Sequence, residues 1–447
     1  MKKKVFSSQL SLLKVELKLL IISLLIIFGT SNPIFTVISL LFITLIVLRE
    51  SINTGMAVLL FLLPFAGVFK LSSDGFALIN LVVIVMVCKL LYKSKFKINF
   101  LSLLLMLIFL IFNVVFHGNT GIFELIKLCI YMFLFNLFFH NDETKSLREL
   151  LTIFSFGIIL AATFGTMTEI FPSISHYIGE EAILRTISRE RIHRFSGLYN
   201  NPNFFTMDIT IALACWICLF LADKAKKFDF VFVIFLISYG LMSISNSFIL
   251  ALAILILLFV LQLAKKSIVK LFSFGIIFIF IIFLAYHFID DQVIYGYIDR
   301  VTRAGNFADI SEITTGRSDL WQFYIEYIFS SLYSLFFGFG IGVSLYQSAH
   351  NFFLEILFNL GVIGTIIYIF NIYCAFDLRK IKNIKGSYVF IPLIMFLFRA
   401  YAINLLLRDN TLFFIALIVL CLKEDFIDNK VDRTKNKGMY FYEEQPI

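Results

Sequence analysis

A histidine with two polar neighbours is the best candidate for proton transfer. His350 and Asn351 open a late apolar segment, and Glu355 follows one helical turn later. We predict that His350 lies in the first turn of this helix, where the dipole favours a neutral imidazole that can act as a general base. Asn351 and Glu355 share a face at i, i+4 and are candidates for substrate binding or for orienting neighbours. The alternative is a histidine that only fills the protein interior.

A second pattern places Arg194 and Gly197 shortly before the sequence Asn200-Asn-Pro-Asn203. Gly, Asn and Pro in such a cluster indicate an ordered turn, and we predict that Asn203 caps the helix that follows. A guanidinium group can form paired hydrogen bonds with phosphate or carboxylate. Arg194 is therefore a candidate catalytic residue that holds an anion, with Asn203 as a substrate-binding neighbour. Turn formation alone is the alternative explanation for the Asn residues.

A third pattern surrounds Arg317, which is followed by Ser318, Asp319 and Trp321. Ser318 is predicted to cap a helix that starts at Asp319. Arg317 then stands beside a helix N-terminus, where free N–H groups and the dipole favour an anion. Arg317 is thus a second candidate for binding an anionic group during catalysis. The alternative is an ion pair between Arg317 and Asp319 or Glu312.

The elements that position these residues are predicted from composition. Hydrophobic residue types make up 60% of the 447 residues and charged types only 15%. Soluble domains contain about 25% charged residues, so this chain lacks the polar surface of a cytosolic enzyme. We interpret the formal net charge of +8 as a result of membrane topology, because Lys and Arg collect on cytoplasmic loops. We therefore expect no nucleic-acid partner. The fold class expected is an all-α polytopic membrane protein.

Apolar windows long enough for membrane helices predict about 12 to 14 spans and both termini on the cytoplasmic side. Two long outer loops interrupt the spans, and the second loop includes a helix on the membrane surface at 318–337. The predicted parts are N-terminal spans in 1–171, a first outer loop at 172–203, central spans in 204–289, a large outer loop at 290–350, C-terminal spans in 351–422 and a cytoplasmic tail at 423–447.

Arginine is concentrated on the predicted outer side. The inner segments hold 27 of the 38 basic residues, but only four of these 27 are Arg, whereas nine of the other eleven are. Arg185, Arg189 and Arg191 of the first outer loop are therefore further candidates for substrate binding. Arg399 lies within a predicted span, where an ion is costly and often functional. The alternatives are scattered salt bridges and lipid headgroup contacts and, for Arg399, an ion pair with Glu355 or Glu169.

Several motifs are absent from the sequence. We find no D-x-D pair, no P-loop, no G-x-S-x-G elbow and no H-E-x-x-H. The histidines have no spacing typical of metal ligands. We therefore expect no metal site and no cofactor.

Taken in order, the three patterns resemble one family, the bacterial O-antigen and capsular polysaccharide polymerases, which are related to the O-antigen ligases. The matching pieces are Arg194 to Gly197 with Asn201 to Asn203, Gly316-Arg317 with Trp321, Gly338 to Gly342, and His350-Asn351. They fall in the family's order over roughly residues 190–370. The chain departs from the family where members often carry Ser-Arg in a central hairpin, because it has Ser245-Asn246 there.

The resemblance implies a fold similar to GT-C glycosyltransferases and a location in the bacterial cytoplasmic membrane. The implied substrate is an undecaprenyl-diphosphate-linked oligosaccharide at the outer face. In this reading His350 accepts the proton of the acceptor hydroxyl. Arg194, Arg317 and Arg399 hold the diphosphate without a metal, and the arginines of the first outer loop steer the donor. A flippase and a chain-length regulator are the protein partners implied.

Two other functions are kept open at this point. A ligase would pass the lipid-linked glycan to a different acceptor, and the residues do not separate it from a polymerase. A non-enzymatic flippase or transporter is the third reading. Transporters usually show repeated halves and polar sites at the membrane midplane, whereas the polar residues here gather at the predicted outer surface.

Overall fold

The computed structural model describes residues 2–93, 97–143, 145–168, 170–178, 194–266, 275, 317–343, 345, 347–381, 384 and 386–423. Every regular element within these ranges is a helix, which confirms the predicted all-helical class for this part of the chain. The α-helices are α1 (Lys2–Gly29), α2 (Pro33–Arg49), α3 (Ile52–Leu62), α4 (Ile79–Lys93), α5 (Phe100–His117), α6 (Ile122–His140), α7 (Leu147–Thr166), α8 (Ser173–Ile178), α10 (Pro202–Leu221), α11 (Phe230–Met242), α12 (Asn246–Lys266), α16 (Arg317–Ile328), α17 (Leu332–Phe337), α18 (Phe352–Ala375), α19 (Ile391–Ala400) and a last helix at Asn410–Lys423. Short 3-10 helices lie at Leu63–Phe65, Lys227–Asp229, Leu378–Lys380 and Ser387–Phe390.

Among the described residues, six helices are long and apolar enough to cross a membrane: α5, α6, α7, α10, α12 and α18. Four shorter apolar helices accompany them, at Pro33–Arg49, Ile52–Phe65, Ser387–Ala400 and Asn410–Lys423. A further apolar window predicted near 270–289 lies outside the described residues apart from Gly275. The coarse prediction of a helical membrane protein therefore agrees with the structure, while the finer count of 12 to 14 spans stays a prediction.

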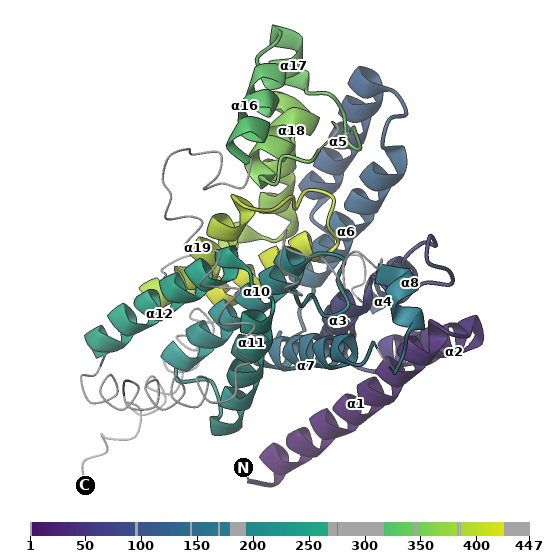
Figure 1. Cartoon of the computed structure of the whole chain (residues 1–447), viewed down its shortest axis with the longest axis vertical. Helices are drawn as coiled ribbons and strands as arrows, with labels where there is room; N and C mark the ends of the chain where they lie inside the picture. Colours follow the sequence, from purple (N-terminus) through teal and green to yellow (C-terminus); the bar gives the residue numbers. More distant parts are fainter. Residues whose placement is uncertain are drawn as a thin grey trace, which may run out of the picture.

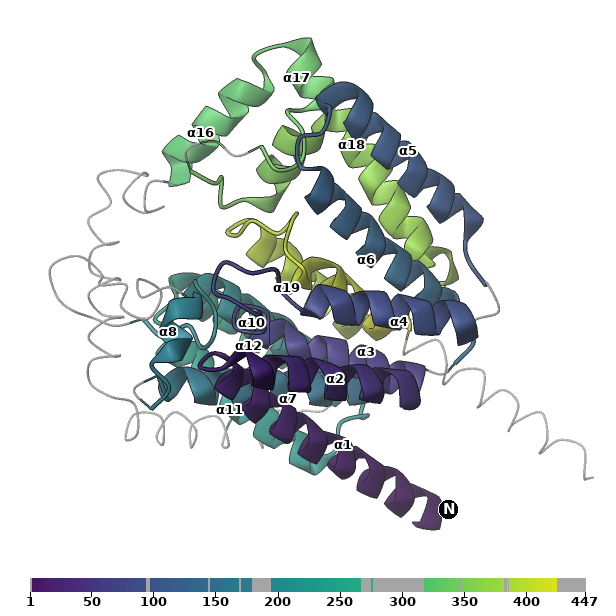
Figure 2. The same cartoon turned by 90° about the vertical axis from the view of Figure 1, so that its right-hand side faces the viewer.

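The helices form two packed groups. In the first, α10 is buried on nearly every side and packs against α7, α11, α12 and α19. In the second, α18 packs against α5, α6, α16 and α17, and Figures 1 and 2 show this group at one end of the molecule. The loop 401–409 joins α19 to the last helix and contacts the second group through Asn351 and Glu355 at the start of α18. Three of the predicted functional residues, Arg317, Asn351 and Glu355, contact this loop.

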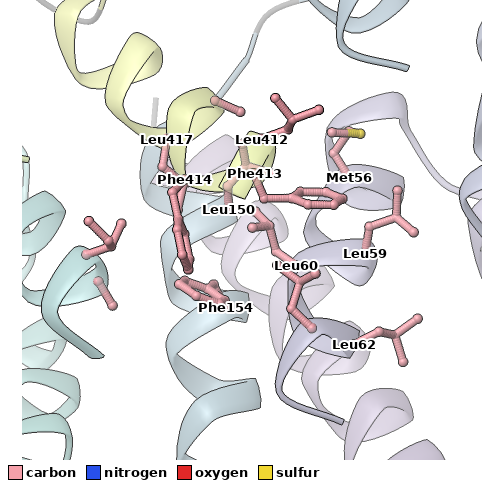
Figure 3. Close-up of a cluster of buried hydrophobic side chains, with 14 of the residues drawn as sticks. Met56, Leu59, Leu60, Leu62, Leu150, Phe154, Leu412, Phe413, Phe414 and Leu417 are labelled. Carbon is pink, nitrogen blue, oxygen red and sulfur yellow. The ribbon is translucent and has the colours of Figure 1, made fainter. Parts of the chain in front are cut away.

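The interior of the first group is apolar and closely packed. Figure 3 shows Phe413 and Phe414 of the last helix among side chains of α3 and α7, including Phe154. The helices α3 and α7 approach each other at Gly157, where an added Cβ would lie 2.7 Å from the carbonyl oxygen of Phe61. Small residues allow such close contact between membrane helices, where van der Waals packing drives association.

The sequence predicted one continuous surface helix at 318–337. This prediction is wrong, because the structure has two separate helices there. α16 ends at Ile328, and Ser331 starts α17 as an N-cap whose hydroxyl accepts from the N–H of Ser334. The predicted cap is also displaced: α16 already includes Arg317, so Ser318 lies inside the helix. Local serine capping therefore breaks a segment whose apolar pattern looked continuous. The position of these helices at a membrane surface stays a prediction.

α16 and α17 are anchored to α18 through a break in that helix. Gly361 has a φ of +61° inside α18, which interrupts the helical hydrogen bonds. The N–H groups of Phe339 and Gly340 donate to the carbonyls of Phe358 and Asn359 at 2.8 and 2.9 Å. The Gly338 to Gly342 segment thus pairs with the backbone that the break exposes.

Replacing Gly157 by valine is expected to destabilise the protein by about 1–3 kcal/mol, because extra atoms are forced into a packed contact. The melting temperature of the purified chain in detergent measures this loss. Gly275→Val is the matched control, since no atom of the described residues lies within 4 Å of the Cβ position at this helical glycine. Equal melting temperatures for the two variants would contradict the account of the α3–α7 contact.

Candidate functional site

Arg399, near the end of α19, is the polar centre of the site. Its side chain is fully buried. Nη1 donates to the hydroxyl of Ser247 at 2.6 Å, and Nη2 donates to the carbonyl of Asn203 and to the hydroxyl of Thr206, both at 2.8 Å. These acceptors come from α12 and from the first turn of α10. One guanidinium therefore holds three segments that lie far apart in the sequence.

The partners of Arg399 among the described residues are all neutral. Within the described residues it forms no ion pair, and its Nε has no hydrogen-bond partner. The predicted alternative of a pair with Glu355 is wrong, because that carboxylate binds elsewhere, and Glu169 lies outside the described residues. A buried charge without a counter-charge is costly, so this position favours a neighbouring anion.

The hairpin 243–247, between α11 and α12, links Arg399 to Arg194. The Nε of Arg194 donates to the carbonyl of Ser243 at 3.4 Å. Two residues on, the hydroxyl of Ser245 donates to Oδ1 of Asn203 at 3.0 Å and lies within hydrogen-bond distance of Ser247. Arg194 and Arg399 thus approach the same hairpin from different elements. The hairpin lacks an arginine of its own, and these two residues bring guanidinium groups to it.

Asn203 takes part in this network but does not cap α10, so the predicted cap is wrong. Asn201 is the N-cap, and its side chain accepts from the N–H of Asn203 at 2.8 Å. Pro202 occupies the first helical position, which is the position that proline favours. That preference was a sequence signal for the cap at Asn201. Asn203 instead offers its side-chain oxygen to Ser245 and its carbonyl to Arg399.

Arg317 approaches the same centre from α16. Its Nη1 donates to the carbonyl of Ala402 at 3.4 Å, in the turn directly after α19. Its positive charge acts on that of Arg399, and burial lowers the pKa of Arg317 itself. The predicted alternative of a pair with Asp319 is not formed, and Glu312 lies outside the described residues. Two like charges that are close and partly desolvated repel each other, and an anion that binds between them lowers this repulsion energy.

His350 precedes α18 instead of lying in its first turn, so that prediction is wrong. Asn351 is the N-cap, and its side chain accepts from the N–H groups of Phe353 and Leu354. His350 has a φ of +48°, and its Nε2 lies 3.5 Å from the hydroxyl of Ser348. The left-handed conformation is uncommon for a residue with a side chain and is often found at functional sites. The half-buried imidazole thus projects from a turn, not from a helix.

Asn351 and Glu355 hold the loop 401–409 in place. The N–H of Asn351 donates to the side chain of Asn404 at 3.1 Å. Oε2 of Glu355 accepts from the N–H groups of Leu405 and Leu406 at 2.9 and 3.1 Å. Both residues were candidates for substrate binding, and in the structure Oδ1 of Asn351 and Oε2 of Glu355 are engaged with the chain. Their contacts are those of positioning residues.

Trp321 of α16 joins the two sides of this arrangement. Its Nε1 donates to the carbonyl of Ala349 at 2.9 Å, and its ring meets that of Tyr401 edge to face at 4.9 Å between centroids. The segment that carries His350 is therefore fixed against the same helix that carries Arg317. Through the loop 401–409, both are also tied to the turn that follows Arg399.

The structure therefore groups Arg194, Arg317 and Arg399 and connects His350 to them through a shared loop. The other sequence candidates, Arg185, Arg189 and Arg191, lie outside the described residues. No cluster of three His, Cys, Asp or Glu residues suited to a metal ion is found in the described ranges.

A cavity of about 350 Å³ lies beside this cluster, and none of the predicted site residues lines it. Its walls come from the 63–70 segment, the 198–208 turn and helix start, and the 405–410 loop, with Lys70, Lys127 and Arg408 as its basic residues. All three belong to the eleven basic residues outside the predicted inner segments, and nothing in their spacing joins them, so the sequence predicts no role for them.

Comparisons of the chain with models of protein families, with curated proteins and with solved structures gave no match. The interpretation of the site therefore rests on its residues and geometry.

Removing the carboxylate in Glu355→Ala is expected to destabilise the protein by about 1–3 kcal/mol, because two N–H groups of the loop lose their acceptor. Thermal unfolding of the purified chain measures the effect. Glu326→Ala, which removes an exposed carboxylate on α16, is the control. If the two variants unfold at the same temperature, Glu355 does not hold the loop.

Proposed function

We propose that this chain is a metal-independent glycosyltransferase that polymerises polyprenyl-diphosphate-linked oligosaccharide units in a membrane. The observation that carries the proposal is the buried guanidinium of Arg399, which has only neutral partners among the described residues and lies close to the charge of Arg317. A diphosphate supplies the missing negative charge. The six apolar helices suit a substrate with a lipid tail.

The proposed reaction is a displacement at the anomeric carbon of the donor glycan. A hydroxyl oxygen of the acceptor forms the new bond to this carbon as the bond to the diphosphate oxygen breaks. The electron pair of the broken bond stays on the diphosphate, and Arg194, Arg317 and Arg399 stabilise the growing charge. His350 accepts the proton of the hydroxyl. No redox step occurs, and the products are a longer lipid-linked glycan and a free polyprenyl diphosphate.

The positioning residues explain how these groups would stay in register. Glu355 and Asn351 fix the loop 401–409, and Trp321 fixes the backbone beside His350. Arginine groups that are placed before the substrate arrives need little reorganisation in the transition state. The proposed role of the hairpin 243–247 is to hold two of these guanidinium groups near each other.

Reconstitution tests the proposal. Purified chain in lipid vesicles, given an undecaprenyl-diphosphate-linked repeat unit and a chelator but no nucleotide sugar, is expected to produce a ladder of longer glycans. His350→Ala, Arg317→Gln and Arg399→Gln are expected to lower the rate at least about a hundredfold, as for other general bases and oxyanion-stabilising groups. Product size and rate are measured by gel analysis of the glycans.

Arg379→Gln is the matched control, because this arginine is exposed within the short helix Leu378–Lys380 and pairs with Asp377 instead of a site residue. A ladder of unchanged rate in the His350 and Arg317 variants would contradict the assigned chemistry. Transfer of glycan to a different acceptor, with no ladder, would instead identify a ligase.

A further inference from the structure

The cavity beside the arginine cluster contains an exposed guanidinium that forms no hydrogen bond or ion pair with the described side chains, although the charges of Asp409, Glu355 and Asp208 act on it. Arg408 lies over the ring of Phe204, with 3.5 Å between the guanidinium carbon and the ring centroid. Among the described residues, its side chain forms no hydrogen bond and no ion pair. Stacking fixes the plane of the guanidinium and leaves its N–H groups available to a ligand.

The other charges around the cavity are held by the protein. Nζ of Lys127 forms an ion pair with Asp409 at 2.9 Å, and Nζ of Lys70 donates to the carbonyl of Ser73 at 3.3 Å. Among the described residues, three basic and two acidic side chains line the cavity, and one of the acidic ones is the buried Asp208. This balance favours an anionic ligand.

The wall at Asp208 is a fixed polar network. Asn410 donates to both carboxylate oxygens at 2.9 Å, and the hydroxyl of Tyr199 donates to Oδ2. Burial and the charge of Asp208 raise the pKa of Tyr199 well above its ordinary value, so the phenol stays a donor. Because Asp208 is almost fully buried and its oxygens are engaged, it shapes the wall and does not need to contact the ligand.

The composition of the cavity disfavours a diphosphate. Two carboxylates near the cations repel a polyanion, whereas a molecule with one carboxylate and several hydroxyls meets both charge signs and the amides of Asn200 and Asn410. A volume of about 350 Å³ lies at the small end of ligand pockets, which span about 300–1,000 Å³. The space fits a sugar unit better than an isolated phosphate.

We propose that this cavity binds an acidic sugar, with one carboxylate, and that Arg408 is its principal ligand. The assignment of that sugar to the growing glycan rests on the proposed function. Leu405 lines the cavity, and its neighbour Asn404 binds Asn351 next to His350, so one loop borders both sites. The cavity is therefore a specificity site that selects repeat units carrying a uronic acid.

Binding by the purified full-length chain tests this inference without any chemistry. The probes are a disaccharide containing glucuronic acid and its carboxyl-reduced analogue, with inorganic pyrophosphate as a third arm, measured by calorimetry. The acidic disaccharide is expected to bind at least about tenfold more tightly than the reduced one, since a paired Arg–carboxylate contact is worth that factor. Arg408→Gln is expected to abolish this preference, and Arg379→Gln to retain it.

Lys70→Gln is the second variant. It is expected to weaken binding of the acidic disaccharide about threefold by removing one nearby charge. Equal binding of both disaccharides by the unmodified chain would overturn the inference, as would a full preference in both cavity variants. Displacement of the acidic disaccharide by an equal concentration of pyrophosphate would overturn it in favour of a second phosphate site.

The inference and the proposed function fail separately. A chain that shows the Arg408-dependent preference but builds no ladder from a lipid-linked repeat unit supports the cavity and refutes the polymerase. A chain that builds equal ladders from acidic and neutral repeat units, with or without Arg408, supports the polymerase and refutes the cavity.

Discussion

One buried positive charge organises the functional end of this protein. Arg399 connects the start of α10, the start of α12 and the end of α19, and all of its partners in the described structure are neutral. A guanidinium in such a place costs free energy that hydroxyl and carbonyl groups only partly offset. If Arg399 only stabilised the fold, an apolar residue would do so without this desolvation cost. A negatively charged ligand bound beside Arg399 offsets this cost. It also offsets the repulsion from the neighbouring charge of Arg317.

The loop 401–409 converts this electrostatic centre into a shaped site. It contacts Arg317 through Ala402, is fixed by Glu355 at Leu405 and Leu406, and lines the adjacent cavity with Arg408. The loop follows α19 of the first group and contacts residues of α16 and α18 in the second. A loop with this many anchors has much of the rigidity of the helices that hold it, so it can fix the positions of the residues that border it.

Much of this could be predicted from sequence, and the failures have physical reasons. Composition alone led to helices in a membrane, because apolar content is a bulk property. Arg194, Arg317 and His350 stood out because each lies in a turn or capping pattern beside a predicted helix, and because arginine is concentrated in the predicted outer loops. The partners of Arg399 could not be predicted, since Ser247 and Asn203 are 152 and 196 residues away and offer common hydroxyl and carbonyl groups. The break before α17 depends on one serine cap, which apolar periodicity does not detect.

The most direct test of the central claim is the affinity of the purified chain for a short, water-soluble polyprenyl diphosphate. If the arginine cluster is an anion site, Arg399→Gln is expected to weaken this binding at least about tenfold, the usual value of a charge-assisted hydrogen bond. The control Arg379→Gln is expected to bind like the unmodified chain. Unchanged affinity in both Arg399→Gln and Arg317→Gln, with the fold intact, would show that the buried charge serves no anionic ligand.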